Sequence, residues 1–143
     1  MSAATMQDSV VFGSLWSQSS VHALFAEIPR TRAWLEIVAV LAEVQSEFDL
    51  IPADSARAVA ACCRSLTVDP ALLEEFRAGR EASGHSMQGL IRLVQARLEP
   101  QHAQWVYAGA TVQDVTDTWT MLVLRQVHKG FEEQLVALDR VLA

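Results

Sequence analysis

The sequence predicts an all-α protein. About half of its 143 residues are hydrophobic, and it holds only six glycines and four prolines, so few positions interrupt regular structure. Apolar side chains recur every three or four residues along most of the chain, which is the spacing of one helix face. The last such stretch, from about residue 112 to 143, contains no proline and a single glycine. These features indicate several packed helices that lead into one long helix.

The first twenty residues are rich in serine and glutamine and carry scattered aromatic side chains. We expect an irregular lead-in segment, with Phe12 and Trp16 as apolar anchors on a larger surface. A short helix is expected from Val21. Pro29 should end or restart it, because proline lacks the N–H group that a helix interior needs.

Residues 31–48 form the first long amphipathic pattern. Its apolar side chains, three or four positions apart, are Trp34, Ile37, Val38, Leu41, Val44 and Phe48. Pro52 ends this stretch and begins a second helix that should run to about Arg64. That second helix carries the apolar residues Ala58, Val59, Ala61 and Cys62. The two helices are expected to pair as a hairpin.

Asp69 and Pro70 are a helix start signal, an N-cap followed by proline at the first helical position, for a helix to about Arg80. After a polar interruption that contains Gly84, the helical spacing resumes and continues to Pro100. The apolar positions of that helix are Leu90, Ile91, Val94 and Leu98.

His85 lies at the entrance of this helix. The helix dipole disfavours a charged imidazole at a helix N-terminus, which suits a neutral donor or acceptor that faces a ligand. The alternative is a capping or surface histidine.

A turn of small and polar residues leads from Trp105 into the last helix. Gly109 allows close approach of the backbone, and Thr111 and Gln113 offer uncharged hydrogen-bonding groups. Because a helix N-terminus carries free N–H groups and about half a positive charge, this turn could hold a carboxylate. Spacing alone favours the alternative, an ordinary cap in which Thr111 or Asp114 bonds the free N–H groups and nothing is bound.

The last helix should be about 45 Å long at 1.5 Å per residue, longer than a compact chain of this size can cover. Its apolar stripe consists of Leu124, Val127, Phe131, Leu135, Leu138 and Leu142. We therefore expect more protein to cover it, as further chain, a partner or copies of itself. Because no stop signal follows the stripe, we expect the chain to be the front of a larger protein or a member that must assemble.

Charge and composition bear on partners and location. A net charge of −6 without a cluster of lysine and arginine argues against nucleic-acid binding. No apolar run approaches the ~20 residues that span a membrane, and no secretory leader is recognisable, so the cytoplasm is the expected location. Cys62 and Cys63 are adjacent and lack metal-ligand spacing, which predicts free, buried or half-buried thiols and no metal.

Three blocks of the chain resemble the fumarase/aspartase superfamily. Residues 25–42, followed by Leu-Ile-Pro-Ala at 50–53, resemble its opening helical hairpin. Residues 81–98 resemble the helix entrance that carries a histidine in adenylosuccinate lyases. Residues 105–118, Trp-Val-Tyr-Ala-Gly-Ala-Thr-Val-Gln-Asp-Val-Thr-Asp-Thr, resemble the first signature block, usually a histidine, two residues, a small residue, Thr-Ser-x-Asp and a helix start. The blocks occur in order over nearly the whole chain.

The resemblance implies an L-aspartase-like fold, with an N-terminal helical domain over residues 1–110 and the first long helix of a central bundle over 111–143. It implies a homotetramer whose active sites combine segments of three subunits and need neither metal nor organic cofactor. The implied reaction is anti β-elimination from succinyl-type substrates, or the related lactone formation of 3-carboxy-cis,cis-muconate cycloisomerases.

By position in this resemblance, His85 falls on a catalytic histidine. The residues that fall on the substrate-carboxylate site are Tyr107, Thr111, Gln113 and Asp114. A base would remove a proton next to a carboxylate, hydrogen-bond donors would stabilise the intermediate, and an acid would assist the leaving group.

The chain also departs from the family pattern. Tyr107 stands where a histidine is common, Val112 replaces a serine, and Val38 replaces a frequent glutamate. Leu15-Trp16 falls on the Arg-Tyr pair of adenylosuccinate lyases, which counts against a nucleotide substrate. The serine-rich loop that supplies the base lies downstream of these residues in the family. Two hypotheses follow: part of a lyase or cycloisomerase that needs further polypeptide, or a non-catalytic helical assembly module of the same descent.

Overall fold

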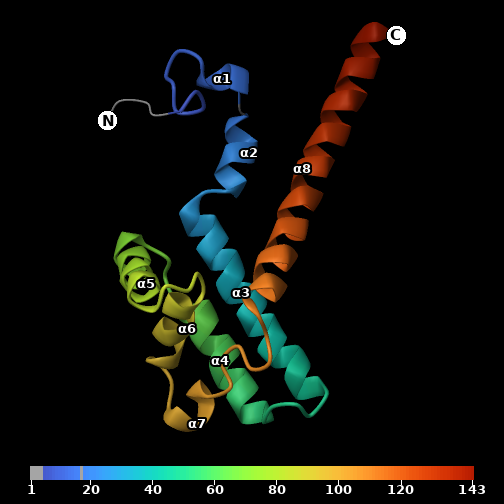
Figure 1. Cartoon of the computed structure of the whole chain (residues 1–143). Helices are drawn as coiled ribbons and strands as arrows, with labels where there is room; N and C mark the ends of the chain where they lie inside the picture. Colours follow the sequence, from blue (N-terminus) through green and yellow to red (C-terminus); the bar gives the residue numbers. More distant parts are fainter. Residues whose placement is uncertain (1–4, 17) are drawn as a thin grey trace.

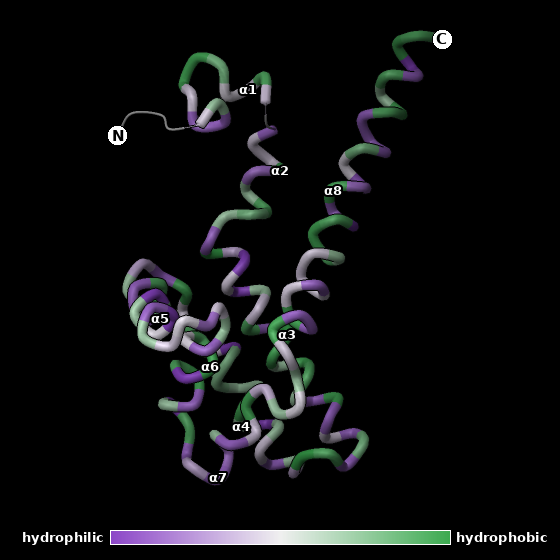
Figure 2. Tube along the Cα trace, in the orientation of Figure 1, coloured by the Kyte–Doolittle hydropathy of each residue, from purple (hydrophilic) through white to green (hydrophobic). Residues whose placement is uncertain are grey.

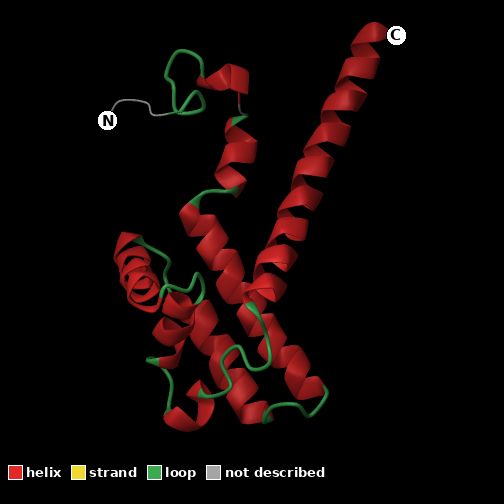
Figure 3. Cartoon of the chain, in the orientation of Figure 1, coloured by secondary structure: helices red, strands yellow, loops and turns green. Residues whose placement is uncertain are grey.

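In the computed structural model of the protein, which describes residues 5–16 and 18–143, the regular elements are all α-helices (Figures 1 and 3). In chain order they are α1 (Gly13–Trp16), α2 (Ser19–Leu24), α3 (Glu27–Glu47), α4 (Ala53–Ser65), α5 (Pro70–Ser83), α6 (Gln88–Gln95), α7 (Pro100–Ala103) and α8 (Val112–Leu142). The all-α prediction is confirmed. Residues 1–4 and 17 of the predicted lead-in segment lie outside the described residues.

The helical hairpin of α3 and α4 is confirmed and forms the centre of the fold (Figure 1). The chain turns between them at Asp49, whose φ of +55° lies in the left-handed region that Asp tolerates better than most residues. The buried apolar side chains of the two helices are Leu35, Val38, Ala39 and Ala42 of α3 and Ala56, Val59, Ala60 and Cys63 of α4. Because most of them are small, the helices approach closely and still fill the space between them.

The predicted stripe of α3 was wrong in part. Phe48, beyond its end, is 70% exposed, and Val44 is 42% exposed, whereas Leu35 lies in the centre of the core. The reason is that α3 carries apolar side chains on more than one side. One side contacts α4, and Trp34 and Ile37 on another side pack only partly against the core. Spacing alone does not choose among such faces.

The short helix expected from Val21 is present as α2, whereas α1 is a helix where an irregular lead-in segment was expected. Phe12 and Trp16 are half exposed or more, so they do not anchor it within this chain. Pro29 restarts helical structure, as one of the two predicted outcomes: α3 begins at Glu27 and places Pro29 in its first turn. There the missing N–H group leaves no hydrogen bond unmade.

Arg32 fastens α3 to the C-terminal end of α4. Its guanidinium donates hydrogen bonds to three backbone carbonyls there, at 3.2 Å to Cys63, 3.0 Å to Arg64 and 3.0 Å to Leu66. The last carbonyls of a helix have no partner within it and carry partial negative charge. The arginine thus satisfies them and complements their charge.

We expect Arg32→Ala to lower the free energy of unfolding by about 2 kcal/mol, because it leaves these carbonyls without their charged donor. Urea denaturation followed by far-UV circular dichroism measures the change. Arg57→Ala is the control, since Arg57 is exposed on α4. It should change stability by less than about 0.5 kcal/mol. Equal effects of the two substitutions would contradict the role of Arg32.

The predicted start of α5 is confirmed. Asp69 Oδ1 accepts a hydrogen bond from the Leu72 backbone N–H at 2.9 Å, and Pro70 occupies the first helical position. The helix ends at Gly84, whose φ of +66° is the left-handed conformation that commonly closes a helix. The loop that carries His85 therefore leaves α5 in a defined direction.

The helix after this loop is shorter than predicted, because α6 ends at Gln95 rather than near Leu98. Its predicted apolar face is correct, with Leu90, Ile91 and Val94 buried. Pro100 begins the short helix α7 and does not itself end α6.

The long helix α8 is confirmed as one uninterrupted element and extends away from the other helices (Figure 1). Only Val115 and Val123 of this helix are buried. The large side chains of its predicted stripe that stay exposed are Leu124, Phe131, Leu135, Leu138 and Leu142. Hydrophobic positions recur along it to its far end (Figure 2). The described residues thus leave this face uncovered, as expected. No described helix is both long and apolar enough to cross a membrane.

Candidate functional site

The turn that leads into α8 ends in a contact between the N-cap residue of the helix and a side chain of its first helical turn. Thr111 is the N-cap of α8. Its backbone N–H donates to Asp114 Oδ2 at 2.7 Å, and its hydroxyl donates to the same oxygen at 3.0 Å. The cap that spacing favours is therefore present in this structure. Both residues are exposed, so the N-terminus of α8 remains open to solvent.

These two donors lower the pKa of the Asp114 carboxyl below its usual value, the Thr111 backbone N–H first and the hydroxyl second. Because the folded-state pKa is depressed, the contact contributes stability above the ordinary aspartate pKa. That contribution is lost as the pH falls through the lowered value.

We expect a carbon-detected NMR titration of the Asp114 carboxyl to give a pKa below the reference value of 3.8. Thr111→Val should raise it part of the way back, since the hydroxyl donor is lost while the backbone donor remains. Thr120→Val is the matched control, because the Thr120 hydroxyl donates at 2.7 Å to the Thr116 carbonyl within the same helix. If both variants shift the Asp114 pKa equally, the Thr111 hydroxyl is not the cause.

Tyr107 presents a neutral phenol next to this cap. Its ring packs partly against the core, and its hydroxyl is shielded from solvent without a hydrogen-bond partner in the described chain. Burial first, and the negative charge of Asp114 second, raise the pKa of the phenol. It therefore stays protonated and can donate a hydrogen bond near neutral pH. Its φ of +64° is uncommon for a tyrosine and stores strain of about 1–3 kcal/mol.

Gln45 of α3 holds this turn in place. Its side-chain Nε2 donates to the Ala108 carbonyl at 2.7 Å, across 63 positions of sequence. Its Oε1 is buried without a partner in the described chain. Sequence reasoning missed Gln45, and the one available signal was a polar residue beside the apolar positions of the 31–48 pattern. Gln113, by contrast, is exposed on the first turn of α8.

In the structure, His85 is not part of the turn before α8. His85 lies exposed in the loop between α5 and α6, and none of its hydrogen bonds within the described chain reaches residues 105–118. Its Nδ1 accepts from the Met87 backbone N–H at 3.3 Å. In the neutral ring Nε2 then carries the proton and is free to donate. His85 thus lies two residues before Met87, the N-cap of α6, on the surface of the chain.

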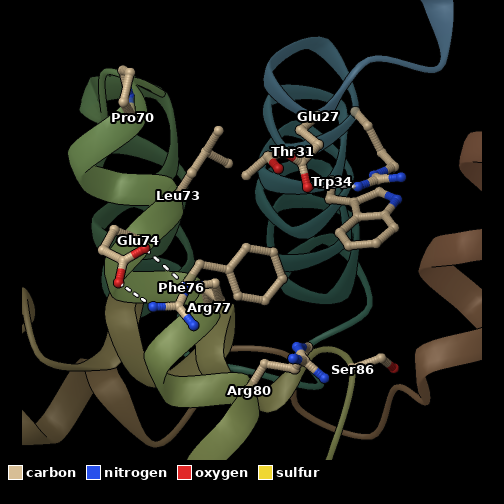
Figure 4. A pocket seen from close by; sticks show the side chains of 11 residues that line it. Glu27, Thr31, Trp34, Pro70, Leu73, Glu74, Phe76, Arg77, Arg80 and Ser86 are labelled. Carbon is tan, nitrogen blue, oxygen red and sulfur yellow. Dashed lines mark hydrogen bonds and ion pairs between the residues drawn. The ribbon is translucent and has the colours of Figure 1, made fainter. Parts of the chain in front are cut away.

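A second feature, missed by sequence reasoning, is a pocket of about 530 Å³ between α3 and α5 (Figure 4). Ser86, the residue after His85, is part of its lining. The residues that line it come from helices distant in sequence, so no local motif signals it.

The two cysteines are free thiols, as predicted. Burial raises the pKa of Cys63 to about 12 and also raises that of the half-buried Cys62. Both thiols are therefore protonated near neutral pH, and neither has the thiolate character of a nucleophile. Within the described residues, no group of three His, Cys, Asp or Glu side chains is arranged to hold a metal ion.

Known proteins share both sequence and fold with this chain, although no protein-family model matches it. It is 30% identical over 125 residues to trans-aconitate decarboxylase 1 of Mycosarcoma maydis, which covers 87% of this chain and 24% of that protein. It is 28% identical over 136 residues to 3-carboxy-cis,cis-muconate cycloisomerase of Pseudomonas aeruginosa, covering 93% and 29% of the two chains. The chain thus spans about a quarter to three-tenths of the length of these relatives.

Solved structures show the same fold. A fumarate lyase from Mesorhizobium sp. BNC1 matches with a TM-score of 0.67 and 25% identity over 77% of this chain and 25% of that one. A 3-carboxy-cis,cis-muconate lactonizing enzyme from Pseudomonas putida matches with a TM-score of 0.70 and 24% identity over 85% and 28%. The second likeness, at under 25% identity, concerns the fold alone.

Proposed function

Because the chain belongs to the fumarase/aspartase superfamily, we propose that it is the part of a lyase or cycloisomerase that presents the substrate-carboxylate turn. The proposed substrate is a small polycarboxylate of the succinyl or carboxymuconate type. The proposed reaction is anti β-elimination or the related lactone formation. The observation that carries the proposal is the open N-terminus of α8, with Thr111 at its cap.

The chemistry of this turn suits a carboxylate. The first N–H groups of α8 and the positive end of its dipole favour an anion there. The Thr111 hydroxyl can exchange its bond to Asp114 for a bond to the ligand, while the Thr111 backbone N–H keeps Asp114 in place. In this account Tyr107 supplies a neutral donor and Gln113 an amide, and Asp114 keeps the shape of the turn.

The remaining catalytic groups come from other segments in this proposal. His85 donates a hydrogen bond from its neutral Nε2–H to the leaving group, and it approaches the turn of another copy of the chain rather than its own. The base comes from polypeptide outside these 143 residues, which agrees with the greater length of the relatives.

Assembly follows from the uncovered face of α8. We propose that residues 1–110 form an N-terminal helical domain and that residues 111–143 begin a central bundle in which α8 packs against copies of itself in a homotetramer. Apolar side chains such as Phe131 and Leu135 would then be removed from water.

The test is an absorbance assay with succinyl and carboxymuconate compounds. We expect no turnover by the 143-residue chain alone. We expect turnover by a longer polypeptide that continues past residue 143. We also expect turnover when the chain is mixed with a partner polypeptide that carries the serine-rich loop of the family. Thr111→Val in the active form should lower kcat/KM by about 100-fold, as the loss of one donor at a developing anion does. Thr120→Val, the matched control, should leave it unchanged.

Turnover by the chain alone would contradict the need for further polypeptide. Inactivity of the longer form towards every such compound would contradict the enzyme itself. The second hypothesis, a non-catalytic assembly module, is favoured by one observation: Val112 has no hydroxyl where the family has a serine. Association of the longer form without turnover would support that hypothesis.

A further inference from the structure

The pocket between α3 and α5 has an apolar part. It is lined by Trp34 of α3 and by Leu73 and Phe76 of α5 (Figure 4). The rings of Trp34 and Phe76 meet edge to face, with centroids 6.4 Å apart and planes at 67°. At about 530 Å³ the pocket is within the usual range for small-molecule sites.

Three arginines line the same pocket, and they differ in how much of their hydrogen-bonding capacity is used. The guanidinium of Arg77 donates hydrogen bonds to the carboxylates of both Glu74 and Glu81. Arg80 has a single long contact within the described residues, 3.5 Å to Glu81, an acceptor that it shares with Arg77. The guanidinium of Arg80 therefore keeps most of its donors available beside the pocket.

Arg30 is also incompletely paired. Its nearest carboxylate oxygen, on the exposed Glu27, lies 3.7 Å away, beyond hydrogen-bond distance. Its Nε is shielded from solvent and has no partner in the described chain, and the same is true of Trp34 Nε1. The guanidinium carbon lies 5.5 Å from the centre of the Trp34 ring, which orients it. Buried donors without an acceptor are unfavourable and call for an explanation.

We propose that this pocket binds an organic anion with a flat apolar body, its carboxylate paired with Arg80 and Arg30 and its body packed on Trp34 and Phe76. Guanidinium groups match carboxylate oxygens in geometry and charge, and aromatic side chains provide flat surfaces. The site is separate from the turn at Thr111, so it goes beyond the proposed function. Because Ser86 lines it, the bound anion contacts the loop that bears His85.

The composition of the lining favours an organic ligand over an inorganic anion. Inorganic phosphate would use the arginines but leave Trp34, Leu73 and Phe76 without a partner. A neutral aromatic molecule would use the rings but leave Arg80 unpaired. Among the lining residues, three arginines outnumber the two carboxylates, Glu27 and Glu74. Glu74 is paired with Arg77, and the contact of Glu27 with Arg30 is 3.7 Å long.

The test compares three probes by NMR of the tryptophan indole N–H signals: trans-cinnamate, its neutral counterpart cinnamyl alcohol, and inorganic phosphate. We expect cinnamate to shift the Trp34 signal saturably, and the other two to bind at least about tenfold more weakly, which corresponds to one lost charged or apolar contact. Arg80→Gln and Arg30→Gln should each weaken cinnamate binding about tenfold. Arg92→Gln, an exposed arginine of α6 outside the pocket, should not change it.

The proposal would be overturned by the absence of a saturable shift at Trp34, by equal affinity for the alcohol or for phosphate, or by unchanged binding in both pocket variants. Circular dichroism of each variant checks that it folds, and the side chain of Arg80 is half exposed, so its loss should not disturb the core. Thr111→Val separates this site from the proposed function. This substitution should leave cinnamate binding unchanged. Weaker cinnamate binding by the Thr111→Val variant would mean that the ligand binds at the turn before α8 and not in the pocket.

Discussion

Gly89→Val is expected to lower the free energy of unfolding by about 3 kcal/mol, because it forces side-chain atoms into a place where two helix backbones touch. A Cβ atom at Gly89 of α6 would lie 2.5 Å from the Phe76 carbonyl oxygen and 2.7 Å from the Arg80 nitrogen, both backbone atoms of α5. On the other side, a Cβ at Gly79 would lie 2.8 Å from the Gly89 Cα. Backbone atoms cannot rotate away as a side chain can, so the helices must separate.

Urea denaturation followed by circular dichroism measures this effect, and Gly130→Ala is its matched control. Gly130 lies inside α8, and apart from the neighbouring backbone of the helix itself no described atom lies within 4 Å of the place that its Cβ would occupy. Alanine there should stabilise the helix by about 0.5–1 kcal/mol, since it restricts the unfolded chain and fits the helix. Similar small effects at both glycines would contradict the close crossing of α5 and α6.

Leu135→Lys is expected to raise the dissociation constant for self-association of the chain by at least about 100-fold. Leu135 is 64% exposed on the uncovered stripe of α8, and in the proposed bundle it would be buried against another copy. The substitution removes an apolar contact and places a charge where water is excluded. Sedimentation equilibrium over a range of concentrations measures the change.

Glu133→Lys is the control for this prediction, because it adds the same side chain on the same helix at a polar position, about half a turn away from the stripe. It should leave the association unchanged. A chain that sediments as a monomer at every concentration would show that something other than a second copy covers α8.

Much of the fold could be predicted because it is encoded locally. The uninterrupted pattern of α8 and the start of α5 at Asp69 and Pro70 depend on residues within a few positions of each other. The buried face of α3 could not be predicted, because several of its sides are apolar and the choice among them depends on which helix packs where. Leu35 lies in the core and Phe48 outside it for this reason.

In the candidate site, too, the contacts between residues close in sequence could be predicted and those between distant residues could not. The contact of Thr111 with Asp114 was one of two predicted outcomes, since it spans three residues. The positive φ of Tyr107 and the partner of Gln45, the Ala108 carbonyl, could not be predicted, because both depend on how α3 meets the turn. The pocket beside Arg80 likewise exists only once α3 and α5 are placed together.

The central claim, that the N-terminus of α8 holds a substrate carboxylate, is tested most directly by titrating fumarate into isotope-labelled protein. The backbone amide signals of Thr111 and Gln113 are followed by NMR, with dimethyl fumarate as the uncharged comparison. We predict a saturable shift of both amides with fumarate and none with the ester, because the helix terminus recognises the negative charge. Equal shifts with the ester, or no saturable shift at the turn, would contradict the account.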